Sequence, residues 1–179
     1  PTQFGPNEDF DRYPRDEACD LELCRRAGVE LVFIPNVPSM YAVDASTRVH
    51  VGGLTEHLCG PHRPGHFDGV ATVVAKLFNV VQPDRAYFGR KDAQQLAVIQ
   101  RMVRDLDMPT TVVGCDTVRE PDGLAMSSRN VNLTAEARER ALSLSRALGA
   151  ARSAITSGER DALAIERQMS AIVAASVPS

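Results

Sequence analysis

Hydrophobic residues recur with a helical period in two stretches near the middle of the chain. In the first stretch, which Asp68 can cap, they fall at i, i+3, i+4, i+7, i+8 and i+11 and so form one wide apolar face. These residues are Val70, Val73, Val74, Leu77, Phe78 and Val81. The second stretch follows the sequence GRKD and places Leu96, Ile99, Val103 and Leu106 on one face. The pattern predicts two amphipathic helices that turn these faces toward a core.

Short apolar runs of the strand type alternate with the helical stretches. Residues 29–34 (VELVFI) form a continuous apolar run between Gly28 and Pro35, which is typical of a strand buried on both faces. A helix over residues 16–27, ended by Gly28, is expected before this strand. Further short strands are expected over residues 47–51, 85–88 and 110–113. The alternation predicts an α/β fold in which a parallel sheet carries helices on both faces and ligands bind beyond the carboxyl ends of the strands.

The pattern changes beyond about Val118, where a polar loop leads into two helices. Thr134 can cap the first helix, and Ser157 and Gly158 end it. The residues of this helix that are expected to point inward are Ala137, Ala141, Leu144 and Leu148. A last helix is expected over residues 161–175. We therefore predict one domain over residues 1–117 and a smaller C-terminal domain over residues 118–179.

Composition and charge narrow the classes of partner. The 179 residues are 44% hydrophobic and carry a formal charge of −3 at pH 7. Lys and Arg are scattered, so the chain lacks the basic patch that binding to nucleic acid or to an anionic membrane would need. No apolar run is long enough to span a bilayer, and the first residues, PTQFGPNEDF, do not resemble a signal peptide. We expect a cytoplasmic protein.

Four cysteines are too few for a disulfide framework in a chain of this length, and free, partly buried thiols are expected. Cys59, His62 and His66 have the spacing C-x2-H-x3-H, which superficially resembles part of a zinc site. The run supplies only three ligands, and prolines and a glycine constrain its backbone. A metal-binding module is therefore the weaker hypothesis, and His66 is expected to orient a loop or to line a pocket.

The sequence GRKDAQQ at residues 89–95 is the first candidate for chemistry, because it joins a predicted strand to a predicted helix. Lys91, near a helix N-terminus, can meet an anionic oxygen with its own charge and with the helix dipole. Asp92 can accept a hydrogen bond from a ribose hydroxyl. The alternative is a solvated loop in which Asp92 serves only as a helix cap.

Two other segments offer polar groups in a suggestive order. In GLAMSSRN, residues 123–130, the hydroxyls of Ser127 and Ser128 precede Arg129, a set of donors that suits a polyphosphate. Gln3, which can donate and accept at once, occurs near Tyr13 in QFGPNEDFDRYPR and suits a hydroxy acid. Solvated surface residues, with Tyr13 packed under a loop, are the alternative for both segments.

Three stretches in this order carry a family resemblance. They are QFGPNEDFDRYPRD, LCGPHRPGHFDGVATVVAKLFNVVQPDRAYFGRKDAQQLAVIQRMVRDLDMP and TVREPDGLAMSSRNVNL. Over nearly the whole chain the sequence resembles the pantothenate synthetases. The resemblance implies a Rossmann-like domain of the HIGH-type nucleotidyltransferase superfamily, a smaller C-terminal domain and a homodimer. It also implies that ATP and Mg²⁺ activate pantoate as pantoyl adenylate and that β-alanine then displaces AMP to give pantothenate.

The same resemblance assigns roles to residues of this chain. It implies that Gln3 and Gln95 hold pantoate, that Gln3 also lies near β-alanine, and that a carboxylate at Asp20 contacts the magnesium ion, although Cys19 stands where an acidic residue is expected. For ATP it implies a nucleotide site in which Lys91 stabilises phosphate charge. The other residues of that site are Gly89 and Asp92 at the ribose, Val118 and Met126 at the adenine, and Ser127, Ser128 and Arg129 as the counterpart of the KMSKS loop.

The family pattern also includes a segment that is not found in these residues. An N-terminal strand and an HxGH loop, whose histidines bind the ATP phosphates, are expected to precede the QFG motif, and the C-terminal domain is expected to continue further. Two hypotheses follow. The residues belong to the adenylating enzyme, or they act by themselves as a substrate-binding fragment that cannot adenylate.

Overall fold

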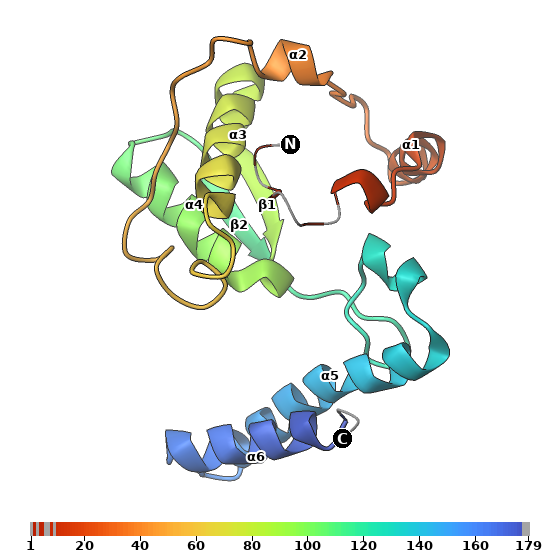
Figure 1. Ribbon diagram of the computed structural model, residues 1–179. Coiled ribbons are helices and arrows are strands. Elements are labelled where there is room, and N and C mark those ends of the chain that lie inside the picture. The colour runs from red at the N-terminus through yellow and green to blue at the C-terminus, as the bar shows by residue number, and fades with distance from the viewer. Residues whose placement is uncertain (1, 3, 6–7, 9, 177–179) are drawn as a thin grey trace. The chain divides into compact units, whose positions relative to one another are not determined.

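A parallel pair of strands lies at the centre of the first of two compact units in this computed structural model (Figure 1). Residues 2, 4–5, 8 and 10–176 are described. Strand β1 (Arg85–Gly89) pairs with strand β2 (Thr111–Cys115), and the register runs from Arg85 opposite Thr111 to Gly89 opposite Cys115. Both strands therefore end at the same edge of the sheet.

Two helices pack against this sheet and form the core of residues 1–116. They are α3 (His66–Val81) and α4 (Ala93–Asp105). Val70 and Ala71 of α3 are buried together with Val98, Ile99 and Met102 of α4. Gly114 of β2 permits close approach, because a Cβ atom at this position would lie 2.9 Å from a methyl carbon of Leu96 on α4. In both α3 and α4, apolar residues that recur with the helical period therefore form the buried face of the helix.

These elements confirm the predicted fold class, an α/β fold of the Rossmann-like type with a parallel sheet flanked by helices. The expected helices on both faces are not seen among the described residues, where α3 and α4 both lie on the face of the strands that carries Phe88 and Gly114. Phe88 of β1 faces α3, where its ring centroid lies 6.4 Å from that of Phe78. Tyr87 points to the opposite side of the strand and is 64% exposed. The alternation of side chains along β1 therefore decides which residues meet the helices.

The predicted helix before Gly28 is present as α1 (Glu17–Arg26). Asp16 caps it by accepting a hydrogen bond from the backbone N–H of Cys19, and Gly28 follows with φ of 76°. The one-turn helices η1 (Phe10–Arg12) and α2 (Val37–Met40) flank it in the chain.

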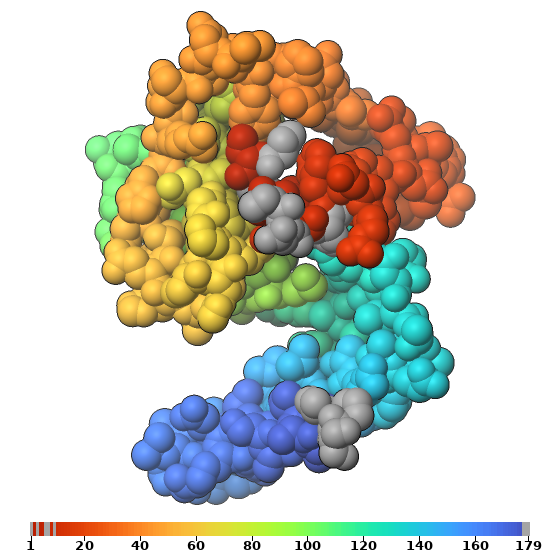
Figure 2. All heavy atoms as spheres, viewed as in Figure 1, coloured from red at the N-terminus to blue at the C-terminus, as the bar shows by residue number. Residues whose placement is uncertain are grey.

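The predicted strand over residues 29–34 is wrong, because these residues form neither helix nor strand. Leu31 is 86% exposed and Ile34 is 53% exposed. The space-filling view shows the orange part of the chain, which includes this run, at the surface (Figure 2). A strand that is apolar on both faces needs neighbouring strands and layers, and among the described residues the sheet consists of β1 and β2 alone.

Two predictions around α3 are also corrected. Residues 47–51 do not form a strand; instead the N–H of Val49 donates to the hydroxyl of Thr72 on α3, and Val51 enters the core. Asp68 is not the helix cap, because α3 begins two residues earlier, after Gly65 turns the chain with φ of 77°. The Asp68 carboxylate lies 2.8 Å from Nδ1 of His50.

The second unit, residues 117–179, consists of a loop and helices. The one-turn helix η3 (Ser128–Asn132) precedes α5 (Ala135–Thr156) and α6 (Ala162–Ala174). Thr134 caps α5 as predicted, since its hydroxyl accepts a hydrogen bond from Ala137 N–H at 3.1 Å. Among the residues that the structure describes, none of the helices combines the length and apolar composition that a bilayer crossing requires.

The face of α5 that is buried differs from the predicted one. Leu144 and Leu148 are 61% and 53% exposed, whereas Leu142, Ala147 and Ala151 are buried. Apolar residues surround α5 on more than one side, and only one of these sides packs against α6. Periodicity alone does not distinguish between such faces.

Candidate functional site

Lys91 lies at the shared carboxyl edge of the two strands. It belongs to the short helix η2 (Arg90–Asp92), which connects β1 to the N-terminus of α4. Its Nζ atom is 3.6 Å from Oδ1 of Asp92, and both side chains are substantially exposed. The Asp92 side chain makes no capping hydrogen bond to α4. An ammonium group at a helix N-terminus, beyond the ends of parallel strands, is well placed for a phosphate ligand.

Gln94 and Gln95 occupy the first turn of α4, and the structure gives the first of them a structural role. The side chain of Gln94 donates to the carbonyls of Leu54 and His57 at 3.0 and 2.7 Å, and its oxygen accepts from the N–H and the thiol of Cys59. These bonds fasten the loop over residues 54–59 to α4. Gln95 is half-buried beside it and remains the predicted substrate ligand.

For the weaker zinc hypothesis, which named Cys59, His62 and His66, the structure shows other contacts. The Cys59 thiol donates to the side-chain oxygen of Gln94, and Nε2 of His66 lies 2.9 Å from Nη1 of Arg63. Within residues 2, 4–5, 8 and 10–176, no three His, Cys, Asp or Glu side chains are arranged to hold a metal ion. All four cysteines are free thiols, of which Cys19 and Cys115 are exposed.

An ion pair that was not anticipated joins the start of the chain to the loop that precedes α3. The Arg63 guanidinium donates to both carboxylate oxygens of Glu8, through Nε at 2.7 Å and through Nη2. These hydrogen bonds are the main reason why the pKa of Glu8 lies below its usual value. Arg63 Nη1 lies 2.9 Å from Nε2 of His66. Since a guanidinium only donates, Nε2 of this buried histidine acts as the acceptor.

Glu8→Gln is expected to lower stability at neutral pH but not in acid. The depressed pKa means that the ion pair stabilises the protein above the unfolded-state value of 4.5, and that the stabilisation is lost as pH falls through the folded-state pKa. At about pH 7 we expect a loss of roughly 1 kcal/mol, or a few degrees in Tm. Thermal melts between about pH 7 and pH 2 measure it. Glu30→Gln, at an exposed position, is the control; an equal loss there, or one independent of pH, would contradict the assignment.

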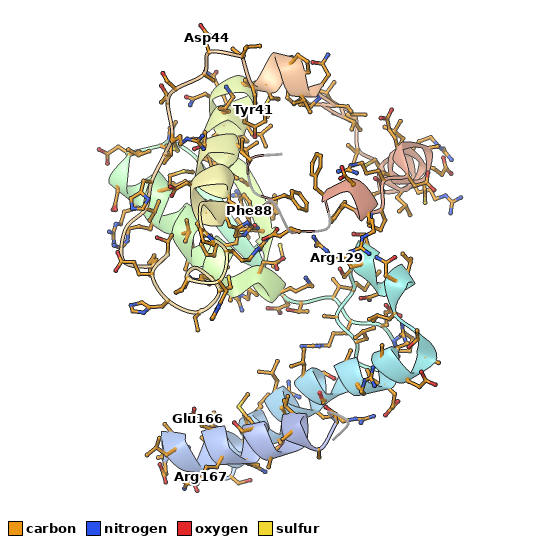
Figure 3. The ribbon with its side chains drawn as sticks, in the orientation of Figure 1. Tyr41, Asp44, Phe88, Arg129, Glu166 and Arg167 are labelled. Atoms are coloured by element: carbon orange, nitrogen blue, oxygen red, sulfur yellow. The ribbon has the colours of Figure 1, made fainter. Side chains whose placement is uncertain are left out.

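A cavity of about 390 Å³ lies in the same unit. It is lined mainly by apolar groups, among them Phe4, Phe33, Met40, Val73 and Leu77. Its polar edge includes the hydroxyls of Thr2 and Tyr41, which are 3.1 Å apart, and Tyr41 lies beside α3 (Figure 3). A volume of this size suits a small organic ligand.

Of the remaining predicted residues of this unit, Gln3 lies outside the described residues. Tyr13 packs edge-on against Phe4 with ring centroids 5.9 Å apart. Asp20 is exposed in the first turn of α1.

The two residues predicted to border adenine are neighbours in the second unit. The N–H of Met126 donates to the carbonyl of Val118 at 3.0 Å, so the two lie across a tight hairpin. Their side chains are 56% and 65% exposed. Exposed apolar side chains at adjacent positions form a surface on which a flat ring can lie.

Ser127, Ser128 and Arg129 follow directly after this hairpin. Ser127 is the cap of η3, and its hydroxyl accepts a hydrogen bond from Arg129 N–H at 3.3 Å. Arg129 lies on η3 (Figure 3). The structure thus brings together the predicted adenine and polyphosphate residues of this unit, and Lys91, Asp92 and Gly89 form the corresponding group in the first unit.

Comparisons with known proteins agree on one family. The family model described as Pantoate-beta-alanine ligase matches residues 1–178. A pantothenate synthetase from Moorella thermoacetica is 61% identical over 169 residues, which are 94% of this chain and 60% of that protein. One from Caldicellulosiruptor bescii is 57% identical over 97% of this chain and 61% of that protein. The chain therefore spans about 60% of the length of these curated relatives.

Solved structures give the same result. The crystal structure of pantothenate synthetase from Thermus thermophilus superposes with a TM-score of 0.94 at 54% identity, over 98% of this chain and 63% of that one. A pantoate-beta-alanine ligase from Francisella tularensis, complexed with beta-gamma ATP and beta-alanine, has a TM-score of 0.76 at 36% identity. The match covers 82% of this chain and 56% of that one.

Proposed function

The chain belongs to the pantoate–β-alanine ligase family, and from this membership we propose that it carries substrate-binding and phosphate-binding residues of an enzyme that joins pantoate to β-alanine at the expense of ATP. The observation that carries the proposal is Lys91 at the common carboxyl edge of β1 and β2. The relative crystallised with beta-gamma ATP and beta-alanine supports the identity of two substrates.

The proposed reaction has two steps. A carboxylate oxygen of pantoate attacks the α-phosphorus of ATP, the bond between that phosphorus and the bridging oxygen breaks, and pyrophosphate leaves. The amine of β-alanine then attacks the acyl carbon of pantoyl adenylate, and AMP departs with the electrons of the carbon–oxygen bond. The products are pantothenate, AMP, pyrophosphate and a proton.

Charge and placement would account for the first step. Negative charge spreads over the phosphate oxygens as the α-phosphorus is attacked, and fixed cationic and hydroxyl donors stabilise it without a protein nucleophile. Lys91 supplies such a charge at the helix N-terminus. We assign Ser127, Ser128 and Arg129 to the β- and γ-phosphates, Val118 and Met126 to the adenine, and Gly89 and Asp92 to the ribose.

We assign Gln3 and Gln95 to the hydroxyl and carboxylate of pantoate. Gln95 lies in the first turn of α4 and does not line the apolar cavity bordered by Phe4 and Leu77, so that cavity is not assigned to pantoate. Tyr13 would support the start of the chain by its packing on Phe4. His66 would contribute by keeping the turn before α3 in place through Arg63.

Gln95→Ala is expected to weaken pantoate far more than ATP. A substrate hydrogen-bonding group that loses its partner stays buried, at a cost of roughly 1–3 kcal/mol, so KM for pantoate should rise about 5- to 150-fold. Steady-state kinetics with each substrate varied in turn measure KM for pantoate and KM for ATP separately. The matched control is Gln100→Ala, on the exposed side of the same helix. An equal rise in KM for pantoate and for ATP would show that Gln95 does not bind pantoate. Gln3→Ala is expected to behave like Gln95→Ala.

Magnesium is the proposed metal, and Asp20 is the residue that would hold it. Mg²⁺ in phosphate-transfer sites usually takes one or two carboxylates together with phosphate and water oxygens. Asp20 offers one exposed carboxylate. When bound, the ion would neutralise phosphate charge.

We further propose that the protein acts in the cytoplasm as a homodimer without nucleic-acid or membrane partners, and that residues 1–117 and 118–179 belong to separate domains.

The test of the function is exchange of labelled pyrophosphate into ATP by the protein that carries this chain, and this exchange should require pantoate. Exchange without pantoate, or with other hydroxy acids alone, would refute the assignment.

A further inference from the structure

The segment that precedes Ser127 is a closed hairpin. The N–H of Glu120 donates to the carbonyl of Leu124 at 2.8 Å, and Arg119 pairs with Ala125 in an isolated antiparallel bridge. Gly123 occupies the turn with φ of 97°, and Leu124 is buried. The hairpin is thus a defined structure.

A cluster of charged and polar side chains holds this hairpin to α5. Arg138, in the first turns of α5, donates through Nε to Oδ2 of Asp122 at 2.9 Å and through Nη2 to both Asp122 and Glu120. Asn130 donates to the other oxygen of Glu120 at 2.8 Å and to the carbonyl of Ala125 at 3.1 Å. About a third of each charged side chain is exposed.

The electrostatics of the cluster depend on one cation. Hydrogen bonds from Arg138 are the first cause of the lowered pKa of Glu120, and the Leu124 N–H followed by Arg138 lowers the pKa of Asp122. Without Arg138, two carboxylates would remain close together on the hairpin. Removing one partner from such a set is more disruptive than neutralising all of its members.

The cluster reaches both ends of the segment over residues 127–129. The hairpin that the cluster holds ends at Met126, directly before this segment. Asn130, which belongs to the cluster, directly follows the segment, and its N–H also donates to the carbonyl of Ser127 at 3.0 Å. Three residues between two fixed points have few alternative conformations. The donors of Ser127 and Arg129 are therefore presented together.

We propose that Arg138 is a positioning residue that fixes the phosphate-binding segment 127–129 by neutralising Glu120 and Asp122. The expected kinetic effect rests on the proposed function, whereas the effect on the conformation of segment 127–129 does not. Arg138 touches no substrate in this scheme and acts through the hairpin and Asn130.

The kinetic test compares Arg138→Met with Glu120→Gln/Asp122→Asn/Arg138→Met in the protein that carries this chain. The single variant should show a KM for ATP raised on the order of tenfold in pantoate-dependent pyrophosphate exchange, with KM for pantoate unchanged. The triple variant should recover most of the loss, because its carboxylates are neutral. Arg140→Met, an exposed arginine two residues away, is the control and should behave as the parent.

Limited trypsin digestion provides a readout that does not depend on activity. Cleavage after Arg129 should be several-fold faster in Arg138→Met than in the parent or the triple variant, at unchanged cleavage of the other sites that all three proteins share. Unchanged cleavage and KM in Arg138→Met, equal losses for both substrates, or no recovery in the triple variant would overturn the inference. A parent protein without exchange would refute the proposed function alone, since the digestion still tests the hairpin.

Discussion

Lys91→Ala is expected to slow formation of pantoyl adenylate about a hundredfold or more while leaving the fold intact. The ammonium lies beyond the carboxyl ends of β1 and β2 and is substantially exposed, so its removal leaves no cavity in the core. Its partner Asp92 is 59% exposed and can be solvated when the ion pair is lost. The change therefore removes charge stabilisation rather than packing.

Single-turnover release of pyrophosphate measures this effect directly. The chain contains one other lysine, Lys76 on α3, and Lys76→Ala is the matched control for loss of one positive charge. Lys91→Arg, which keeps the charge, should retain more activity than Lys91→Ala. A near-normal rate of pyrophosphate release in Lys91→Ala would contradict the role given to this residue.

The central elements were predictable because local sequence determines them. The apolar faces of α3 and α4 follow the helical period, and the strands that follow these helices, β1 and β2, are short β-rich runs bounded by polar turns. The cap at Thr134 was readable from its residue type, since its hydroxyl accepts a hydrogen bond from the backbone N–H three residues later.

The wrong predictions concern segments whose structure depends on contacts with other helices and strands, which the local sequence does not specify. Residues 29–34 have the composition of a buried strand, but among the described residues no strand pairs with them. On α5 several apolar sides compete, and Leu142 rather than Leu144 is buried. The spacing of apolar residues identifies a helix or strand more securely than it identifies the other elements against which that helix or strand packs.

The same distinction applies to the candidate site. The order strand, GRKD, helix was sufficient to place Lys91 at the ligand-binding edge of the sheet. The pairs Glu8 with Arg63 and Glu120 with Arg138 were not foreseen, because the partners are 55 and 18 residues apart and nothing in the local sequence links them. Likewise, spacing gave no indication that Gln94 fastens the 54–59 loop while Gln95, its neighbour, does not share those bonds.

A polypeptide confined to residues 1–179 is expected to show no detectable pantoate-dependent pyrophosphate exchange. The family members it matches are longer, and these residues span about 60% of their length. The phosphate-binding groups assigned to it are Lys91 and the segment over residues 127–129. The exposed apolar run over residues 29–34 should also make this polypeptide prone to association and its thermal melt broad.

A chimera tests whether the missing activity resides in the segments outside the match. Fusing to residues 1–179 the remaining segments of the Moorella thermoacetica relative, which is 61% identical over the matched part, should restore both exchange and a sharp thermal transition. The chimera with Lys91→Ala should melt as sharply but exchange about a hundredfold more slowly, which separates folding from chemistry. Robust exchange by residues 1–179 alone would mean that they contain every phosphate-binding group that adenylation requires, and that the division of roles proposed between Lys91 and segment 127–129 is incomplete.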